Sequence, residues 1–290
     1  MKPDVKTFYD KRSGTASHVV WCARSKACAV IDPVFDLDPA SGHTSCKPIE
    51  MIASFVRERG LRLGWILDTH IHHDHISGAS ELKRLLGGTI AIGDRVGEVA
   101  TAITDVYGLE PRHIQLDPFD KLLADGEHLP LGDFTVEALA TPGHTIDHLS
   151  FVIGDAVFAG DTLFMPDSGT ARCDFHRGSA SALFQSIKRI LDRADDVDLF
   201  ACHDYGAAGR RAPAWHSTVG AQRSANIHIG NGTDESAFVI LREKRDASLD
   251  MPALMLLSLP LNIRAGALPA VSAHGRIMLS VPLNVPRNAM

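Results

Sequence analysis

The chain has 290 residues, which is enough to bury a core in one large domain or two small ones. Hydrophobic residues make up 45% and charged residues 22% of it, the composition of an ordinary soluble globular protein. The net charge of −6 without a lysine- and arginine-rich run argues against a nucleic-acid partner, and the lack of a signal peptide or long apolar run predicts a cytoplasmic protein without membrane association.

In the first part of the chain, alternating apolar residues predict a hairpin of two strands, followed by a loop rich in Pro, Asp, Ser and Gly. Apolar residues at helical spacing then predict a helix that ends at Gly60. The expected elements are strands 18–22 and 27–32, loop 33–48, helix 49–59, strand 63–67, helix 80–86, strand 89–92 and helix 96–107.

The second part changes period after residue 121, where strand-like runs are broken by Gly-containing turns. Gly154-Asp155 between two apolar runs is a strong hairpin signal. We expect strand runs within 121–141, a hairpin of 149–153 and 156–159, helix 182–194, strand 197–202, helices 217–225 and 234–244, and an irregular Pro- and Leu-rich tail, 252–290. This succession favours two sheets between helices over a doubly wound parallel sheet.

Four segments place potential metal ligands directly after a strand or in a turn. The first, residues 69–75, holds His70, His72, Asp74 and His75, and the other three contribute His144, Asp161 and His203. Imidazole and carboxylate donors that converge from several segments are what a transition-metal site needs. The set is large enough for one metal ion or for two adjacent ions.

The pattern H-x-H-x-D-H, a distant His, an Asp in Gly160-Asp161-Thr162 and a last His resembles the metallo-β-lactamase superfamily. The resemblance implies an α+β fold, an αββα sandwich of two mixed sheets with the metal at their edge. It implies a single domain over residues 1–290, with a core of about 15–206. Residues 207–290 would be a C-terminal extension that completes the substrate pocket and could form a dimer interface.

Two reactions fit the ligands. With two Zn²⁺ ions, the resemblance implies one site at His70, His72 and His144, a second at Asp74, His75 and His203, and Asp161 as bridge. Such a site would hydrolyse a thioester, as in glyoxalase II-like enzymes. With one Fe²⁺ ion, the remaining coordination positions could bind O₂ and a thiol-derived substrate.

The segment Arg172-Cys173-Asp174-Phe175 resembles the arginine-x-aspartate-phenylalanine segment of persulfide dioxygenases. The surroundings of the last histidine, His203-Asp204-Tyr205-Gly206, and the later Arg223 extend this likeness. It implies one Fe²⁺ held by His70, His144 and Asp161, with His72, Asp74, His75 and His203 around them as further donors.

The same likeness implies that glutathione persulfide is oxidised by O₂ to sulfite and glutathione. Asp74, His75 and His203 would be catalytic, and Tyr205, Arg223 and Arg172 would bind the substrate, since arginine and tyrosine suit carboxylates. The apolar run 254–257 suggests a homodimer.

Overall fold

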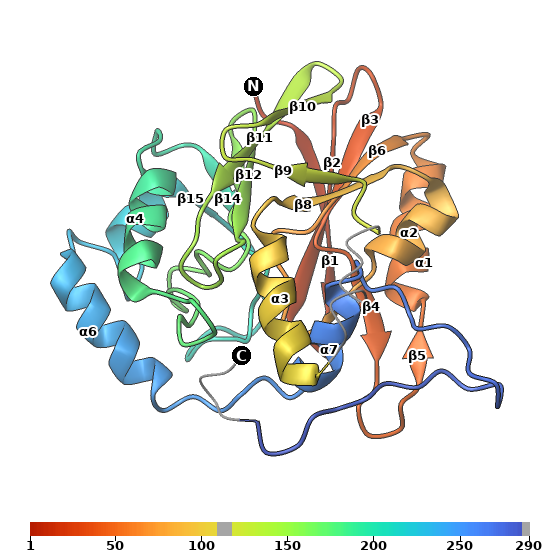
Figure 1. The fold of residues 1–290 in the computed structure, drawn as a ribbon. Coiled ribbons are helices and arrows are strands. Elements are labelled where there is room, and N and C mark those ends of the chain that lie inside the picture. Colours follow the sequence, from red (N-terminus) through yellow and green to blue (C-terminus); the bar gives the residue numbers. More distant parts are fainter. Residues whose placement is uncertain (109–117, 286–290) are drawn as a thin grey trace.

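The computed structural model describes residues 1–108 and 118–285. Two six-stranded sheets lie face to face between two groups of helices (Figure 1). This arrangement confirms the expected αββα sandwich. No helix within the described residues is both long and apolar enough to cross a membrane.

The first sheet has the order β1-β2-β3-β6-β8-β9 and the second the order β10-β11-β12-β13-β14-β15. A small third sheet has the order β5-β4-β7. Parallel pairs (β3 with β6, β6 with β8, β8 with β9, β13 with β14) bring strand ends to a shared edge. The strands of the first sheet are β1 (Asp4–Asp10), β2 (Thr15–Trp21), β3 (Ala27–Ile31), β6 (Arg62–Leu67), β8 (Thr89–Gly93) and β9 (Lys121–Leu123). Those of the second are β10 (His128–Leu131), β11 (Phe134–Ala140), β12 (Leu149–Ile153), β13 (Ala156–Phe158), β14 (Asp198–Phe200) and β15 (His216–Thr218), and the small sheet has β4 (Val34–Leu37), β5 (Thr44–Ser45) and β7 (Ile76–Ser77).

The helices divide between the two outer faces of the sandwich (Figure 1). Apolar residues of α1, α2, α3 and α7 pack in one cluster with the first sheet, and those of α4, α5 and α6 pack with the second. Their bounds are α1 (Lys47–Glu58), α2 (Ala79–Leu86), α3 (Val96–Tyr107), α4 (Ala180–Leu191), α5 (Val219–Ala225), α6 (Glu235–Asp246) and α7 (Met255–Asn262).

Strand alternation explains why the sheets have two buried faces. In β3, Cys28 and Val30 join the cluster under the helices, whereas Ala29 and Ile31 join the cluster between the sheets. Successive side chains of a strand point to opposite faces, so both faces of this sheet are buried. The layers hold the strand ends, and the loops that follow them, in fixed places.

The strands and helices differ from the sequence expectation at several places, which include the unexpected short strand β7. The N-terminal strand β1 was not predicted, and the expected loop 33–48 contains β4 and β5. The expected helix 217–225 begins as strand β15, and the tail that was expected to be irregular contains α7. Of these elements, β4 pairs with β7 and α7 packs against β7, contacts with distant residues that a local pattern does not reveal.

Candidate metal centre

The candidate ligands lie at one edge of the two sheets, in the loops that follow their strands. His70, His72, Asp74 and His75 follow β6, His144 follows β11, Asp161 follows β13 and His203 follows β14. All but Asp74 are buried, and Asp74 is partly buried. The structure therefore brings together all seven donors that the sequence indicated.

One group consists of His70, His144 and Asp161, whose potential ligand atoms lie within 4.8 Å of one another. The Nε2 atom of His144 lies 3.5 Å from Oδ2 of Asp161. Two imidazoles and one carboxylate with room for further ligands are the set that non-haem iron enzymes use.

In each of the two histidines of this group, Nδ1 forms a hydrogen bond with another residue. Nδ1 of His144 donates to the carbonyl of Arg172 at 2.8 Å. The Thr69 hydroxyl donates to the Asp32 carboxylate at 3.1 Å, so it accepts from Nδ1 of His70 at 2.9 Å. Both rings therefore carry their proton on Nδ1 and present the Nε2 lone pair to the centre.

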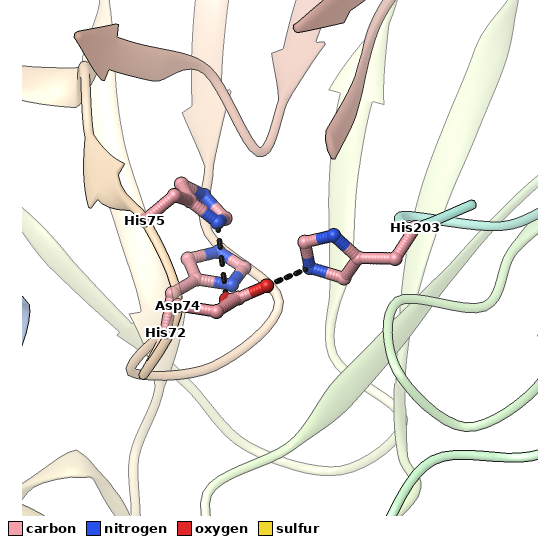
Figure 2. A group of neighbouring side chains, drawn as sticks. All are labelled: His72, Asp74, His75 and His203. Carbon is pink, nitrogen blue, oxygen red and sulfur yellow. Dashed lines mark hydrogen bonds and ion pairs between the residues drawn. The ribbon is translucent and has the colours of Figure 1, made fainter. Parts of the chain in front are cut away.

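A second group consists of His72, Asp74, His75 and His203, again with ligand atoms within 4.8 Å (Figure 2). Asp74 lies between two histidines, with Oδ1 3.3 Å from Nδ1 of His75 and Oδ2 3.2 Å from Nε2 of His203. The Tyr205 hydroxyl donates to Oδ2 of Asp74 at 2.6 Å. The Asp74 carboxylate therefore interacts with three protein side chains, those of His75, His203 and Tyr205.

Several buried donor atoms lack a hydrogen-bond partner among the described residues. Among the candidate ligands they are Nε2 of His70, Nδ1 of His72, Nε2 of His75, Oδ1 of Asp161 and Nε2 of His203. Buried polar atoms without a partner are costly and call for an explanation such as a bound ion. These atoms converge from two groups, so the residues present fit a metal centre.

Burial sets the protonation of the donors. It lowers the pKa of His144 and of His203 to about 4 and holds the pKa of His70 well below its usual range. These imidazoles are therefore neutral near pH 7, the form that binds metal. Burial and the nearby Asp74 carboxylate raise the pKa of Asp161, a penalty that a bound cation would offset.

Asp32 is a functional residue that the sequence analysis missed. Its Oδ1 accepts from Nε2 of His72 at 3.0 Å and from the backbone N–H of Thr69 at 2.8 Å. Burial lowers the pKa of His72, but the carboxylates of Asp32, Asp68 and Asp74, with Asp32 foremost, more than offset this and raise the pKa to about 9. Asp32 follows β3 at the sheet edge where residues 69–75 follow β6, and this parallel strand-end position is the signal that could have found it.

A cavity of about 610 Å³ opens beside the donors. Its wall includes Asp74, His144, Asp161 and His203, so the metal centre faces the cavity directly. Apolar and charged side chains share the rest of the wall. The apolar ones are Phe164, Phe175, Ile227, Leu249 and Leu254, the basic ones Arg12, Arg172, Arg242 and Arg245, and the acidic ones Asp167 and Asp250.

Two of the three expected substrate residues, Tyr205 and Arg172, line this cavity. The guanidinium of Arg172 pairs with Asp174 at 2.6 Å, donates to the Asp250 carbonyl at 2.6 Å and lies 4.9 Å from the centroid of the Phe175 ring. The Phe175 ring is stacked on His73 at 4.0 Å. The arginine thus braces the wall beside the ligand His144 as well as facing the cavity.

The structure places Arg223, the third expected substrate residue, away from this cavity, so its role in substrate binding stays a prediction. Its guanidinium donates to the carbonyls of Leu191 and Arg193 and pairs with Asp195 at 2.5 Å. It lies among the residues of another surface depression and not in the wall of the metal-centre cavity. The reason is local: α5 presents this side chain to the end of α4, whose last carbonyls need donors.

Comparison with known proteins places these residues in a family context. Residues 11–203 match the model of the Metallo-beta-lactamase superfamily. The chain is 45% identical to a Beta-lactamase hydrolase-like protein of Xylella fastidiosa, over 99% of this chain and 66% of that protein. It therefore spans just under two thirds of that relative.

Two further relatives differ in their named activities. Glyoxylase B2 of Dictyostelium discoideum is 38% identical over 98% of both chains. The human mitochondrial persulfide dioxygenase ETHE1 is 27% identical over 90% of this chain and 88% of that protein. The crystal structure of ETHE1 from Myxococcus xanthus superimposes with a TM-score of 0.73 at 24% identity, covering 91% of this chain and all of that one, which shows the shared fold.

Proposed function

Because the chain belongs to the metallo-β-lactamase superfamily, we propose that it is an Fe²⁺-dependent persulfide dioxygenase. Its substrate is glutathione persulfide, which with one O₂ and one water gives glutathione and sulfite. The partners are thus a small thiol-derived molecule and O₂. A metal-dependent enzyme follows from the family and the donor set, and the reaction is the step that we add.

The observation that carries this proposal is the arrangement around Asp161 and Asp74. His70, His144 and Asp161 form a two-histidine, one-carboxylate group, of which His144 and Asp161 line the cavity. Asp74, which a second metal would need, accepts hydrogen bonds from Tyr205 and His75 instead. One Fe²⁺ ion in the first group would supply open coordination positions for O₂ and for a soft sulfur.

The chain's own residues prepare the site for an anionic substrate. Arg245 at the cavity wall gives the pocket a positive contribution, which suits the carboxylates of a glutathione derivative. Phe164 and Leu254 exclude water from part of the wall. The relationship to persulfide dioxygenase ETHE1, at 27% identity, supports this choice of substrate.

A second candidate is a glyoxalase II-like thioesterase that uses two Zn²⁺ ions. It is favoured by the second donor group, in which His72, Asp74, His75 and His203 lie within 4.8 Å of one another. The greater identity to Glyoxylase B2, 38%, supports it as well. In that enzyme both donor groups, Asp161 included, would hold the ions, which would activate water for attack on the thioester.

Metal analysis and two assays separate these candidates. Protein purified without O₂ is analysed for iron and zinc, then tested for O₂ uptake with sulfite formation from glutathione persulfide and for hydrolysis of S-lactoylglutathione. One iron per chain with O₂ uptake supports the dioxygenase. Two zinc ions with thioester hydrolysis and no O₂ uptake would overturn it.

A further inference from the structure

The last helix of the described chain, α7, reaches the metal-centre loop from outside the family domain. The family match ends at residue 203, whereas α7 spans Met255–Asn262. This helix nevertheless packs against β7, the strand that directly follows the ligand loop. Residues far along the chain therefore contact the backbone that carries the donors.

Asn262 makes three hydrogen bonds to this backbone. Its Nδ2 donates to the carbonyl of His72 at 2.8 Å and to that of His75 at 2.7 Å. Its Oδ1 accepts from the N–H of Ser77 at 2.8 Å. The side chain is 1% exposed, so every polar atom of this amide is used on the loop.

Neighbouring residues extend the contact on both sides of Asn262. The Ser258 hydroxyl, one turn earlier in α7, donates to the carbonyl of His73 at 2.9 Å. After the helix, the carbonyl of Ala265 accepts from the N–H of Ser80 at 3.1 Å. A Cβ atom on Gly266 would lie 1.7 Å from the carbonyl oxygen of Ser77, so the two backbones are fitted closely.

Other residues hold the first part of the loop, so its two halves are fixed by different parts of the chain. Asp32 binds the N–H of Thr69, and Asp147 binds the N–H of Ile71 at 2.9 Å. These contacts fix the part that carries His70. The part from His72 to Ser77 is held by α7.

We propose that Asn262 is a positioning residue of the metal centre. By fixing the carbonyls of His72 and His75 and the N–H of Ser77, it sets the direction in which three donors leave the backbone (His72, Asp74 and His75). An irregular loop cannot satisfy its own buried carbonyls, and without outside donors it would take up other conformations. The role is the same for one ion or two, and for iron or zinc.

The test uses the full-length protein loaded with Co²⁺, whose absorption spectrum reports the geometry of its ligands. Asn262→Asp keeps the size of the side chain but removes both N–H donors to the carbonyls. We expect release of Co²⁺ to a chelator to become roughly 10- to 100-fold faster and the spectrum to change, as when partners of metal ligands are removed elsewhere.

Met255→Ala is the matched control, because Met255 is buried in the same helix but forms part of the apolar cluster. For each variant, the rate of Co²⁺ release is measured at a temperature that lies the same number of degrees below the Tm of that variant. Faster release and an altered spectrum in Asn262→Asp alone support the proposal. Equal release and an unchanged spectrum in both variants would refute it, because Asn262 would then only stabilise the fold.

Ser258→Ala keeps the proposal testable should Asn262→Asp not fold. It removes the bond to the His73 carbonyl and a longer one, at 3.4 Å, to the Met255 carbonyl in the same helix, and it keeps the backbone hydrogen bonds of α7. We expect a several-fold faster release with Tm near that of the unaltered protein. Unchanged release and an unchanged spectrum for this variant would count against the role of α7.

Discussion

At the residue scale, the three partners of Asp74 decide how freely it can bind a metal. Its carboxylate faces His75 and His203 and accepts from the Tyr205 hydroxyl at 2.6 Å. Burial raises its pKa, but His203, His75 and Tyr205 together lower it well below the usual range. Asp74 is therefore an anion that the protein itself already neutralises in part.

Removing the Tyr205 hydroxyl should strengthen a second metal site. In Tyr205→Phe, the Asp74 carboxylate loses the hydrogen bond from the Tyr205 hydroxyl. A hydrogen bond to a charged group is worth about 1.5–3 kcal/mol, and a second metal ion would no longer have to displace it. We expect the affinity for a second Zn²⁺ to rise roughly tenfold or more. Calorimetric titration of the metal-free protein measures this, and equal second-site affinities in the two proteins would contradict the assignment.

Asp161 should be necessary for metal binding under either candidate function. Asp161→Asn replaces the anionic donor that faces His144 and His203 with a neutral and weaker one. Metal content per chain should fall close to zero. Asp167→Asn is the control, since Asp167 lines the same cavity but pairs with Arg210, and it should retain its metal.

At the scale of elements, Arg223 joins α5 to the end of α4. Three of its hydrogen bonds go to the carbonyls of Leu191 and Arg193, which lie at and just beyond the last turn of α4. The last carbonyls of a helix have no donors within the helix. A cation at this end donates hydrogen bonds to them and interacts favourably with the helix dipole. These bonds give Arg223 a structural role at the junction of the two helices.

Arg223→Ala should therefore lower stability and leave the Michaelis constant unchanged. The loss of bonds to the Leu191 and Arg193 carbonyls should lower the free energy of unfolding by about 1–2 kcal/mol. Urea unfolding measures the first effect, and steady-state kinetics with the confirmed substrate measures the second. A raised KM at unchanged stability would return Arg223 to the substrate pocket.

How well the sequence predicts each element depends on how local its determinants are. The donors of residues 69–75 could be found because a strand followed by clustered ligands is a local pattern. The face on which Arg223 lies depends on how α5 packs, so the sequence could not show that this side chain points towards the end of α4. Helix α7 contains Pro260, a residue that argues against a helix in the sequence. Contacts with the distant loop that contains His72 hold this helix in place.

At the scale of the whole molecule, the cavity is assembled from remote segments. Its wall combines Arg12 near the start, the ligand loops, and residues 245–254 near the end of the described chain. The sequence predicted the αββα sandwich because strand and helix periods recur along the chain. It could not predict which arginines face the metal, because that depends on how the layers meet. The homodimer, the cytoplasmic location and the single-domain organisation remain predictions.

Burial of His228 makes the stability of the whole molecule depend on pH. This residue lies under Gly169, and its Nδ1 accepts from the N–H of Thr170 at 3.0 Å, away from the metal ligands. Burial, together with Arg242 and Arg245, lowers its pKa to about 4. In the unfolded chain the pKa returns to about 6.5, so below that pH the unfolded state binds a proton that the folded state refuses.

The contribution of His228 to stability is therefore complete above about pH 6.5 and is lost as the pH falls towards 4. Between pH 6.5 and 5 the loss should reach up to about 2 kcal/mol. In His228→Gln, which keeps an acceptor but cannot titrate, the free energy of unfolding should fall less steeply over this range. Urea unfolding of both metal-free proteins at pH 7, 6 and 5 measures the difference. Since the other buried histidines are the same in both proteins, equal slopes would mean that folding does not lower the pKa of His228.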